Sequence, residues 1–189
     1  MKVSMTLDRT QLAALRNACA ATGKSLPREL SIAVNKTAKV VRKDMVKDVF
    51  TGLRLPKAEI SKRIKVIGRA NRSKLASNVT LFGTSRLSLK WFAYKQTSAG
   101  IPYKIEKTGK RNVAKGAFQG PKPRIVNPKL KNAVWKRVGK SRYPLARLHG
   151  VSIGPYFESH QLPEKTIVKG GVRLSYEVNR RIRKIVGGF

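Results

Sequence analysis

Acidic residues are scarce in this sequence: nine Asp and Glu stand against 42 Lys and Arg, which gives a net charge of +33. Self-repulsion at that charge opposes compaction and favours a polyanionic partner, such as DNA, RNA, an acidic protein surface or anionic lipid. The nine acids are spread singly along the chain, so they give no paired-carboxylate signature. We therefore expect a binding or structural protein and not an enzyme.

Cysteine and histidine are nearly absent. The single Cys19 excludes an internal disulfide and points to a reducing compartment, and its Ala-rich setting predicts a small buried residue. His149 and His160 are the only histidines, so no cluster of metal ligands can be built at a recognised spacing. We expect neither a metal nor another cofactor, and nothing in the sequence places Cys19 beside a histidine as a catalytic pair.

Long apolar runs are also missing. No run approaches the roughly 20 residues that span a bilayer, and the N-terminal segment lacks the apolar core of a secretory signal. We expect no membrane association. The segment "ATGKS" (21–25) resembles the end of a phosphate-binding loop, but Ala18 stands where that motif needs a glycine. A helix end followed by a helix start is the better interpretation.

The positive charge is not confined to a tail. Residues 1–59 hold 12 Lys and Arg, 60–157 hold 23, and 158–189 hold 7. Between Ile60 and Phe157 the only acid is Glu106, yet this stretch is rich in aromatic residues, including Trp91 and Trp135. Basic tails are usually poor in aromatics. We therefore expect a folded region with a basic surface, and core positions for both tryptophans.

The N-terminal third is predicted to be helical. A short strand (2–7) precedes a helix over 9–22 that Asp8 caps and Gly23 ends. A second helix opens at Ser25, and its apolar residues recur at spacings of three and four. These residues are Leu30, Val34, Ala38, Val41, Met45 and Val49, with Lys36, Lys39, Lys43 and Lys47 to the other side.

Beyond Gly52 the pattern changes. A short helix over 55–64 is followed by apolar residues at a period of two, which predicts strands. Residues 107–131 are rich in Gly, Pro, Lys and Asn and are predicted to form a long loop. The predicted strands are 77–83, 87–96, 101–107 and 132–139, with the second and third joined in a hairpin at 97–100.

A last helix is predicted after Pro163, because Leu174, Val178, Ile182 and Ile185 form an apolar stripe. The fold class is therefore α+β, with N-terminal helices, a central antiparallel β-sheet carrying a long basic loop, and a C-terminal helix. We expect one domain over 1–189, in which 1–64 is mainly helical, 65–157 mainly β, and 158–189 the C-terminal helix.

Two basic segments each have two interpretations. The segment 51–66 is either a helix-turn-helix whose short helix reads DNA, or a basic helix that packs Leu55, Ile60 and Ile64 into the core. The cations of 173–184 form either a solvated helix face or a contact with a polyanion.

Two stretches carry a resemblance to a known family: "AKGAFQGPKP" (114–123) and "AVWKRVGKSRYPLARLHGVSIGPYF" (133–157). In the order of these elements the chain resembles the phage minor tail protein Z family, also called tail-completion proteins. The basic helix over 30–49 is similar as well, and the resemblance spans about residues 25–160 but departs in the 107–131 loop. The matching positions are Gly116, Ala117, Phe118, Arg137, Gly139, Lys140, Arg142, Tyr143, Pro144, Leu145, Gly154, Pro155 and Phe157.

The resemblance implies a structural virion protein without catalytic chemistry, assembled in the cytoplasm of the bacterial host. Such a protein acts at the head-proximal end of the tail, where it helps head–tail joining and holds or passes the DNA end. The implied partners are copies of itself in a hexameric ring, tail terminator or tail tube proteins, head–tail connector proteins, and double-stranded DNA in the lumen.

In that setting we expect the aromatic ring of Tyr143 to be buried, with Leu145 and Leu148 as further anchors and with Pro144 and Pro155 fixing turns. The candidate contacts with DNA or a partner are Lys110, Arg111, Lys115, Lys140, Arg142, Arg147, Arg180, Arg181, Arg183 and Lys184. The alternative function is a nucleic-acid-binding protein, either sequence-independent or of helix-turn-helix type.

Overall fold

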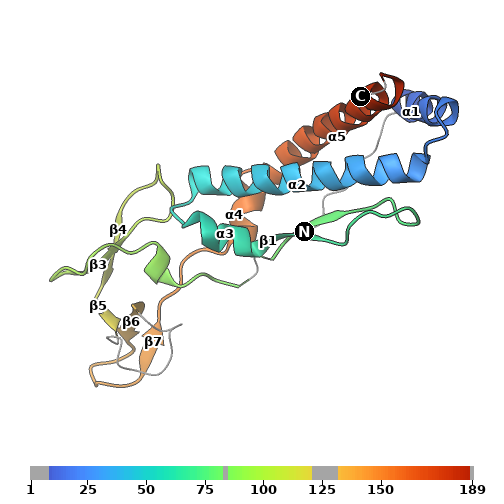
Figure 1. Ribbon diagram of the computed structural model, residues 1–189. Helices are drawn as coiled ribbons and strands as arrows, with labels where there is room; N and C mark the ends of the chain where they lie inside the picture. The colour runs from blue at the N-terminus through green and yellow to red at the C-terminus, as the bar shows by residue number, and fades with distance from the viewer. Residues whose placement is uncertain (1–8, 83–84, 121–131, 188–189) are drawn as a thin grey trace. The chain divides into compact units, whose positions relative to one another are not determined.

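The computed structural model describes residues 9–82, 85–120 and 132–187 (Figure 1). It confirms the α+β class, with helices first, antiparallel strands in the middle and a helix last. The helices are α1 (Arg9–Ala21), α2 (Leu26–Gly52), α3 (Lys57–Arg63), α4 (Ile153–Ser159) and α5 (Leu162–Val186), with a 3₁₀ turn η1 (Leu89–Trp91). The strands are β1 (Ile64–Ile67), β2 (Asn78–Leu81), β3 (Gly100–Tyr103), β4 (Asn112–Lys115), β5 (Ala117–Gly120), β6 (Ala133–Arg137) and β7 (Leu145–Arg147).

Contacts group the chain into two compact units. The first comprises Met1–Lys47, Ser61–Phe82 and Phe157–Phe189, and the second comprises Asp48–Ile60 and Gly83–Tyr156. The first unit therefore combines segments from the N-terminal and C-terminal parts of the chain with the β1–β2 hairpin.

In the first unit, α1 packs against α5 (Figure 1). Their shared core contains Leu15 and Cys19 from α1 and Leu174 and Val178 from α5. The predicted burial of Cys19 and the predicted stripe of the C-terminal helix are therefore confirmed. Gly23, with φ +67°, ends the turn after α1, where the N–H of Lys24 donates to the carbonyl of Cys19 at 3.0 Å. "ATGKS" is thus a helix end, as expected.

The first unit also contains an antiparallel hairpin. Strand β1 pairs with β2 from Ile64–Leu81 to Ile67–Asn78, which confirms the strand predicted at 77–83. Ile60 and Ile64 are fully buried and Leu55 is nearly so, which favours the packing interpretation of 51–66 over a DNA-reading helix. The strand predicted at 2–7 lies outside the described residues.

The second unit contains two small sheets in place of one central sheet. Strand β3 pairs with β4, and β5, β6 and β7 form a three-stranded antiparallel sheet in that order. The strands predicted at 101–107 and 132–139 are confirmed as β3 and β6. Strands β4 and β5 lie at 112–120, within the segment predicted as a loop, and residues 121–131 of that segment lie outside the described residues.

The strand predicted at 87–96 is wrong over its first part. Residues 87–92 contain the η1 turn and bury Leu87, Leu89 and Phe92 through a local bend instead of through strand alternation. The hairpin predicted at 97–100 is confirmed, because Ala93 forms an antiparallel bridge with Tyr103 and Thr97 forms one with Gly100. Apolar residues at a period of two over a few positions fit both a strand and a local bend, so the spacing alone did not distinguish the two conformations.

The predicted burial of Tyr143 is also wrong, since its side chain is 66% exposed. The ladder between β6 and β7 ends at the pair Arg137–Leu145, so Tyr143 lies in the connection beyond the paired residues. Leu145 and Leu148 are half-buried. Pro155, expected in a turn, lies instead in the first turn of α4, where a proline is tolerated.

Two glycines provide a test of this fold. A Cβ at Gly171 of α5 would meet no atom within 4 Å, so Gly171→Ala should raise the free energy of unfolding by about 1 kcal/mol through helix propensity. Gly100 has φ +130°, and a Cβ there would lie 2.3 Å from the carbonyl oxygen of Ala114. Gly100→Ala should therefore lower that free energy by more than about 1 kcal/mol. Urea denaturation followed by circular dichroism measures both, and a destabilised Gly171→Ala variant would contradict the exposure of this α5 face.

Candidate anion-binding site

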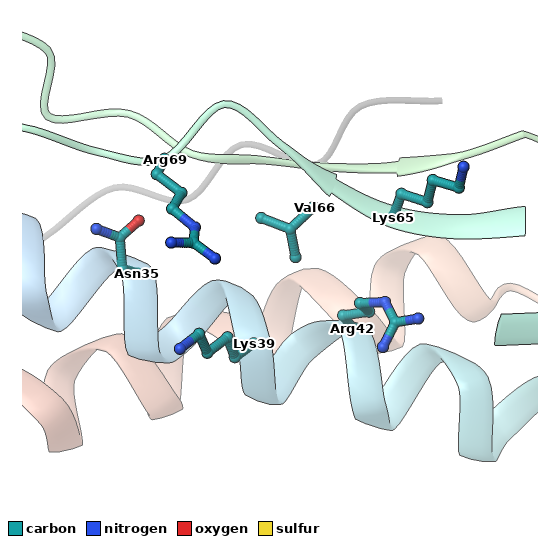
Figure 2. Close-up of a pocket in the computed structure, with 6 residues that line it drawn as sticks. All are labelled: Asn35, Lys39, Arg42, Lys65, Val66 and Arg69. Atoms are coloured by element: carbon teal, nitrogen blue, oxygen red, sulfur yellow. The ribbon is translucent and has the colours of Figure 1, made fainter. Parts of the chain in front are cut away.

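A pocket of about 480 Å³ lies in the first unit between α2 and the β1–β2 hairpin (Figure 2). Its lining comprises four cationic side chains, one amide and one apolar residue, with no acid. Asn35, Lys39 and Arg42 come from α2, and Lys65, Val66 and Arg69 come from β1 and the turn that follows it.

Two of the lining residues hold the hairpin on the helix. The amide of Asn35 pairs with the backbone of Ala70 in both directions, because its Nδ2 donates to the Ala70 carbonyl at 2.8 Å and its Oδ1 accepts from the Ala70 N–H at 2.9 Å. The Arg42 guanidinium donates to the carbonyl of Ile64 at 2.7 Å, to the carbonyl of Ser61 at 3.0 Å and to the Ser61 hydroxyl at 2.6 Å. These bonds fix the walls of the pocket.

The other three cations, Lys39, Lys65 and Arg69, are exposed at the pocket. Within the ranges that the structure describes, their side chains have no hydrogen-bond or ion-pair partner. Figure 2 shows Arg69 and Val66 reaching from the hairpin toward α2, while the ammonium of Lys65 points away from the helix. The donors that remain for a ligand therefore come from both walls.

This arrangement suits an anion. Like charges that line one pocket repel one another, and a bound anion relieves that repulsion while accepting their hydrogen bonds. The Arg69 guanidinium offers a planar pair of donors that matches phosphate oxygens, and the lysines add point charges. The chemistry on offer is electrostatic recognition of a phosphate or a similar oxyanion.

A second group of cations lies along α2 and α5 in the same unit. The pKa of Lys36 is lowered, first by the positive charge of Arg181, then by burial and by Arg180, with a further effect of Lys184. Glu177 is fully buried and accepts from Arg173 at 2.5 Å, and Arg181 pairs with Glu29 at 3.3 Å. Of the contacts predicted on this helix, Arg181 is therefore bound inside the unit.

Arg180, Arg183 and Lys184 are exposed. Arg180 lies 3.9 Å from Glu177, at the outer limit of an ion pair. These three side chains can meet a partner, but they do not line the pocket.

The remaining predicted contacts lie in the second unit. Lys110, Arg111, Lys115, Lys140 and Arg142 are exposed there, whereas Arg147 is half-buried in β7. Arg111 stacks on Tyr94 at 3.9 Å from the ring centroid, and Arg54 stacks on the same ring at 3.6 Å. Two guanidinium groups this close to one centroid must occupy opposite faces of the ring, so Arg111 has an internal partner.

Four positions of the family resemblance, Ala117, Phe118, Arg137 and Leu145, lie in one sheet. Ala117 pairs with Lys136 and Phe118 with Trp135 between β5 and β6, and Arg137 pairs with Leu145 between β6 and β7. Gly116, with φ +68°, makes the turn between β4 and β5. Gly139, Tyr143 and Pro144 lie in the exposed connection that follows β6, and Gly154 and Pro155 lie in α4.

Trp91 and Trp135 are half-buried, which fits neither a full core role nor a free stacking platform. The indole Nε1–H of Trp135 donates to the carbonyl of Gly120 at 3.0 Å, so this ring is held by its own sheet. Its edge is therefore not available as a donor to a base.

The pocket itself was not predicted from the sequence. Lys39 was assigned to a solvated face of the second helix, and Asn35, Arg42, Lys65 and Arg69 were not singled out. The only sequence signal is a polar Asn35 within the apolar run of α2, together with two cations four residues apart in a strand and its turn. The pocket exists only because the hairpin folds back onto α2.

Variants of Asn35 and Lys39 distinguish a lining residue that stabilises the fold from one that is available to bind a ligand. Asn35→Ala removes both bonds to the backbone of the buried Ala70 and should lower the free energy of unfolding by about 2 kcal/mol. Lys39→Ala removes an exposed side chain without a described partner and should change the free energy of unfolding by less than about 0.5 kcal/mol. Urea denaturation of both variants checks this, and equal stabilities would show that the hairpin is not held by Asn35.

In the described ranges, no helix has the length and apolar composition needed to cross a lipid bilayer. Neither the family models, nor the curated proteins, nor the solved structures with which the chain was compared contain a match to it.

Proposed function

We propose that this protein is a structural component of a phage tail or neck that contacts the backbone of double-stranded DNA. It is a tail-completion subunit at the head-proximal end of the tail, where it helps head–tail joining and holds or passes the DNA end. The observation that carries the DNA contact is the basic pocket, in which four cations and no acid line one concave site.

Backbone phosphates fit this pocket better than bases do. Lys and Arg side chains supply the contacts that hold a protein on DNA independently of its sequence. The pocket is lined by the β1–β2 hairpin and by one side of α2, and not by a helix that could enter the major groove. The short α3, the candidate reading helix, buries Ile60 fully.

The tail assignment is supported by the family resemblance. Parts of its two stretches, Ala117–Gly120 of β5 and Ala133–Arg137 of β6, are separated in the sequence but pair in one antiparallel sheet.

The proposed assembly is a hexameric ring around DNA, next to tail terminator, tail tube or connector proteins. A ring of six subunits at +33 each would carry far more charge than the DNA it encloses can neutralise. We therefore expect the neighbouring proteins to present acidic faces to this one.

The virion location can be tested by mass spectrometry of purified particles from the phage that encodes this chain. We expect the protein in mature particles, in low copy relative to the tail tube protein. Particles that contain the other tail proteins but lack this one would contradict the proposal, whatever the result of DNA-binding measurements.

The DNA contact can be tested by neutralising the three exposed cations of the pocket. The variant Lys39→Gln, Lys65→Gln and Arg69→Gln should bind duplex DNA at least about tenfold more weakly than the parent. The slope of log affinity against log salt should fall by up to about 2.7, because each of the three lost phosphate contacts contributes about 0.9. Fluorescence anisotropy over a salt series, on two unrelated duplexes, measures both quantities.

The matched control neutralises three exposed cations of the same unit outside the pocket, Arg9, Arg16 and Lys24. It removes the same charge and should weaken binding by less than about threefold. Equal losses in both variants would show that total charge, and not the pocket, determines affinity. A difference of more than about tenfold between the two duplexes near 150 mM salt would favour the alternative, a sequence-reading nucleic-acid-binding protein.

A further inference from the structure

A second group of cations lies where α5 meets α2, in the same unit as the pocket. The two helices contribute to one apolar core, and the ion pair between Arg181 of α5 and Glu29 of α2 joins them at 3.3 Å. Four side chains close enough to affect one another form what we call the α2–α5 cation cluster: Lys36 from α2, and Arg180, Arg181 and Lys184 from α5.

The acids near this cluster do not neutralise it. Glu29 is taken up by Arg181. Glu177 is fully buried, accepts a hydrogen bond from Arg173 at 2.5 Å, and lies 3.9 Å from Arg180, which is the outer limit of an ion pair. Two carboxylates are thus shared among more cations than they can pair, and positive charge is left over.

The protonation of Lys36 reports this excess. Its pKa is lowered, first by the positive charge of Arg181, then by burial and by Arg180, with a smaller effect of Lys184. Glu177 acts in the opposite direction but does not reverse the result. The potential at Lys36 is therefore positive even when the nearby carboxylate is counted, which is the condition under which a bound anion is favourable.

The cluster is continuous with the pocket along α2. Lys36, Lys39 and Lys43 follow one another at spacings of three and four residues, so they are neighbours on the helix surface. Lys39 lines the pocket, and Lys43 is exposed beside it. In the ranges that the structure describes, neither Lys36 nor Lys43 has a hydrogen-bond or ion-pair partner. One basic surface therefore runs from the β1–β2 hairpin across α2 to α5.

The length of this surface selects a chain of phosphates over a single one. From Lys36 to Lys43 the helix rises about 10 Å, at 1.5 Å per residue. Each strand of duplex DNA presents one phosphate about every 3.4 Å along the axis, so about three phosphates span this distance. A single phosphate in the pocket would leave the α2–α5 cation cluster without an anion, whereas a phosphodiester chain meets both.

The surroundings of the cluster favour a nucleic-acid backbone over an acidic protein. Protein interfaces have an apolar centre from which charged residues are depleted. Along α2, which is described in full, Phe50 is the only exposed large apolar side chain, and it lies 14 residues beyond Lys36, or about 21 Å along the helix. A phosphate backbone needs no apolar contact, because cations alone hold it.

We propose that the α2–α5 cation cluster is a second phosphate subsite, and that it binds the same DNA backbone as the pocket. Lys36, Arg180 and Lys184 contact the phosphates that follow the one held by Lys39 and Arg69. Arg181 positions α5 through Glu29 and is not a contact. The inference rests on the proposed DNA contact and adds α5 to it.

The test variant is Lys36→Gln with Lys184→Gln, and it leaves Arg180 beside Glu177. Gln and Lys have similar helix propensities, so the variant should keep the circular dichroism spectrum and melting temperature of the parent. It should bind duplex DNA at least about fivefold more weakly, and the salt slope should fall by up to about 1.8, at 0.9 for each lost contact. The control Arg16→Gln with Lys24→Gln, two exposed cations of the same unit, should lose less than about twofold.

A footprint on the unmodified protein gives a readout that does not depend on how a variant folds. Lysines are acetylated with and without duplex DNA, and the extent at each is measured by mass spectrometry. Lys36, Lys39 and Lys184 should react at least about threefold more slowly in the complex. Lys24, which lies away from this surface in the turn after α1, should react equally in both samples.

The outcomes separate this inference from the function on which it rests. If the parent does not bind DNA, both are overturned. If neutralising the pocket weakens binding while Lys36→Gln with Lys184→Gln behaves like its control, and Lys36 and Lys184 stay fully reactive in the complex, only the second subsite is overturned. A poly-glutamate of equal charge that competes as well as DNA would overturn the choice of phosphate and favour an acidic protein on this surface.

Discussion

Mutual repulsion among 42 cations, with nine acids to offset them, is the constraint to which the rest of the structure responds. The acids are used mainly inside the units. Glu177 is fully buried and accepts from Arg173, and Glu29 pairs with Arg181. A buried carboxylate needs such partners to offset its desolvation. The acids in these internal pairs leave few negative charges on the surface, which is almost entirely positive.

Cations without a carboxylate are stabilised by other acceptors. Arg42 donates to the backbone carbonyls of Ser61 and Ile64, and Arg54 donates to the carbonyl of Phe92 at 3.3 Å while it stacks on Tyr94. The ammonium of Lys107 lies 3.6 Å from the centroid of the Phe50 ring. Carbonyl oxygens and aromatic faces thus replace the missing acids within each unit. They satisfy donors without cancelling charge, so the positive potential that would attract a polyanion remains.

The pocket is a consequence of the same imbalance. In the pocket, neutral amide bonds from Asn35 bring the hairpin onto α2 and gather cations that then lack an anion. A phosphate group fits these cations because it is a compact anion with several hydrogen-bond acceptors.

The sequence by itself determined the helices and the charge. The repeats of three and four in α2 and α5, and Gly23 as a helix end, are local patterns that follow from helix geometry and left-handed backbone preference, and they were predicted correctly. The basic, acid-poor character follows from composition alone. Tertiary structure decided what local patterns cannot: that 87–92 bends instead of extending, that Tyr143 lies beyond the last strand pair, and that β4 and β5 form within the expected loop. It also decided that Lys39 and Arg69, 30 residues apart, line one pocket, because the hairpin bonds that bring them together join distant parts of the chain.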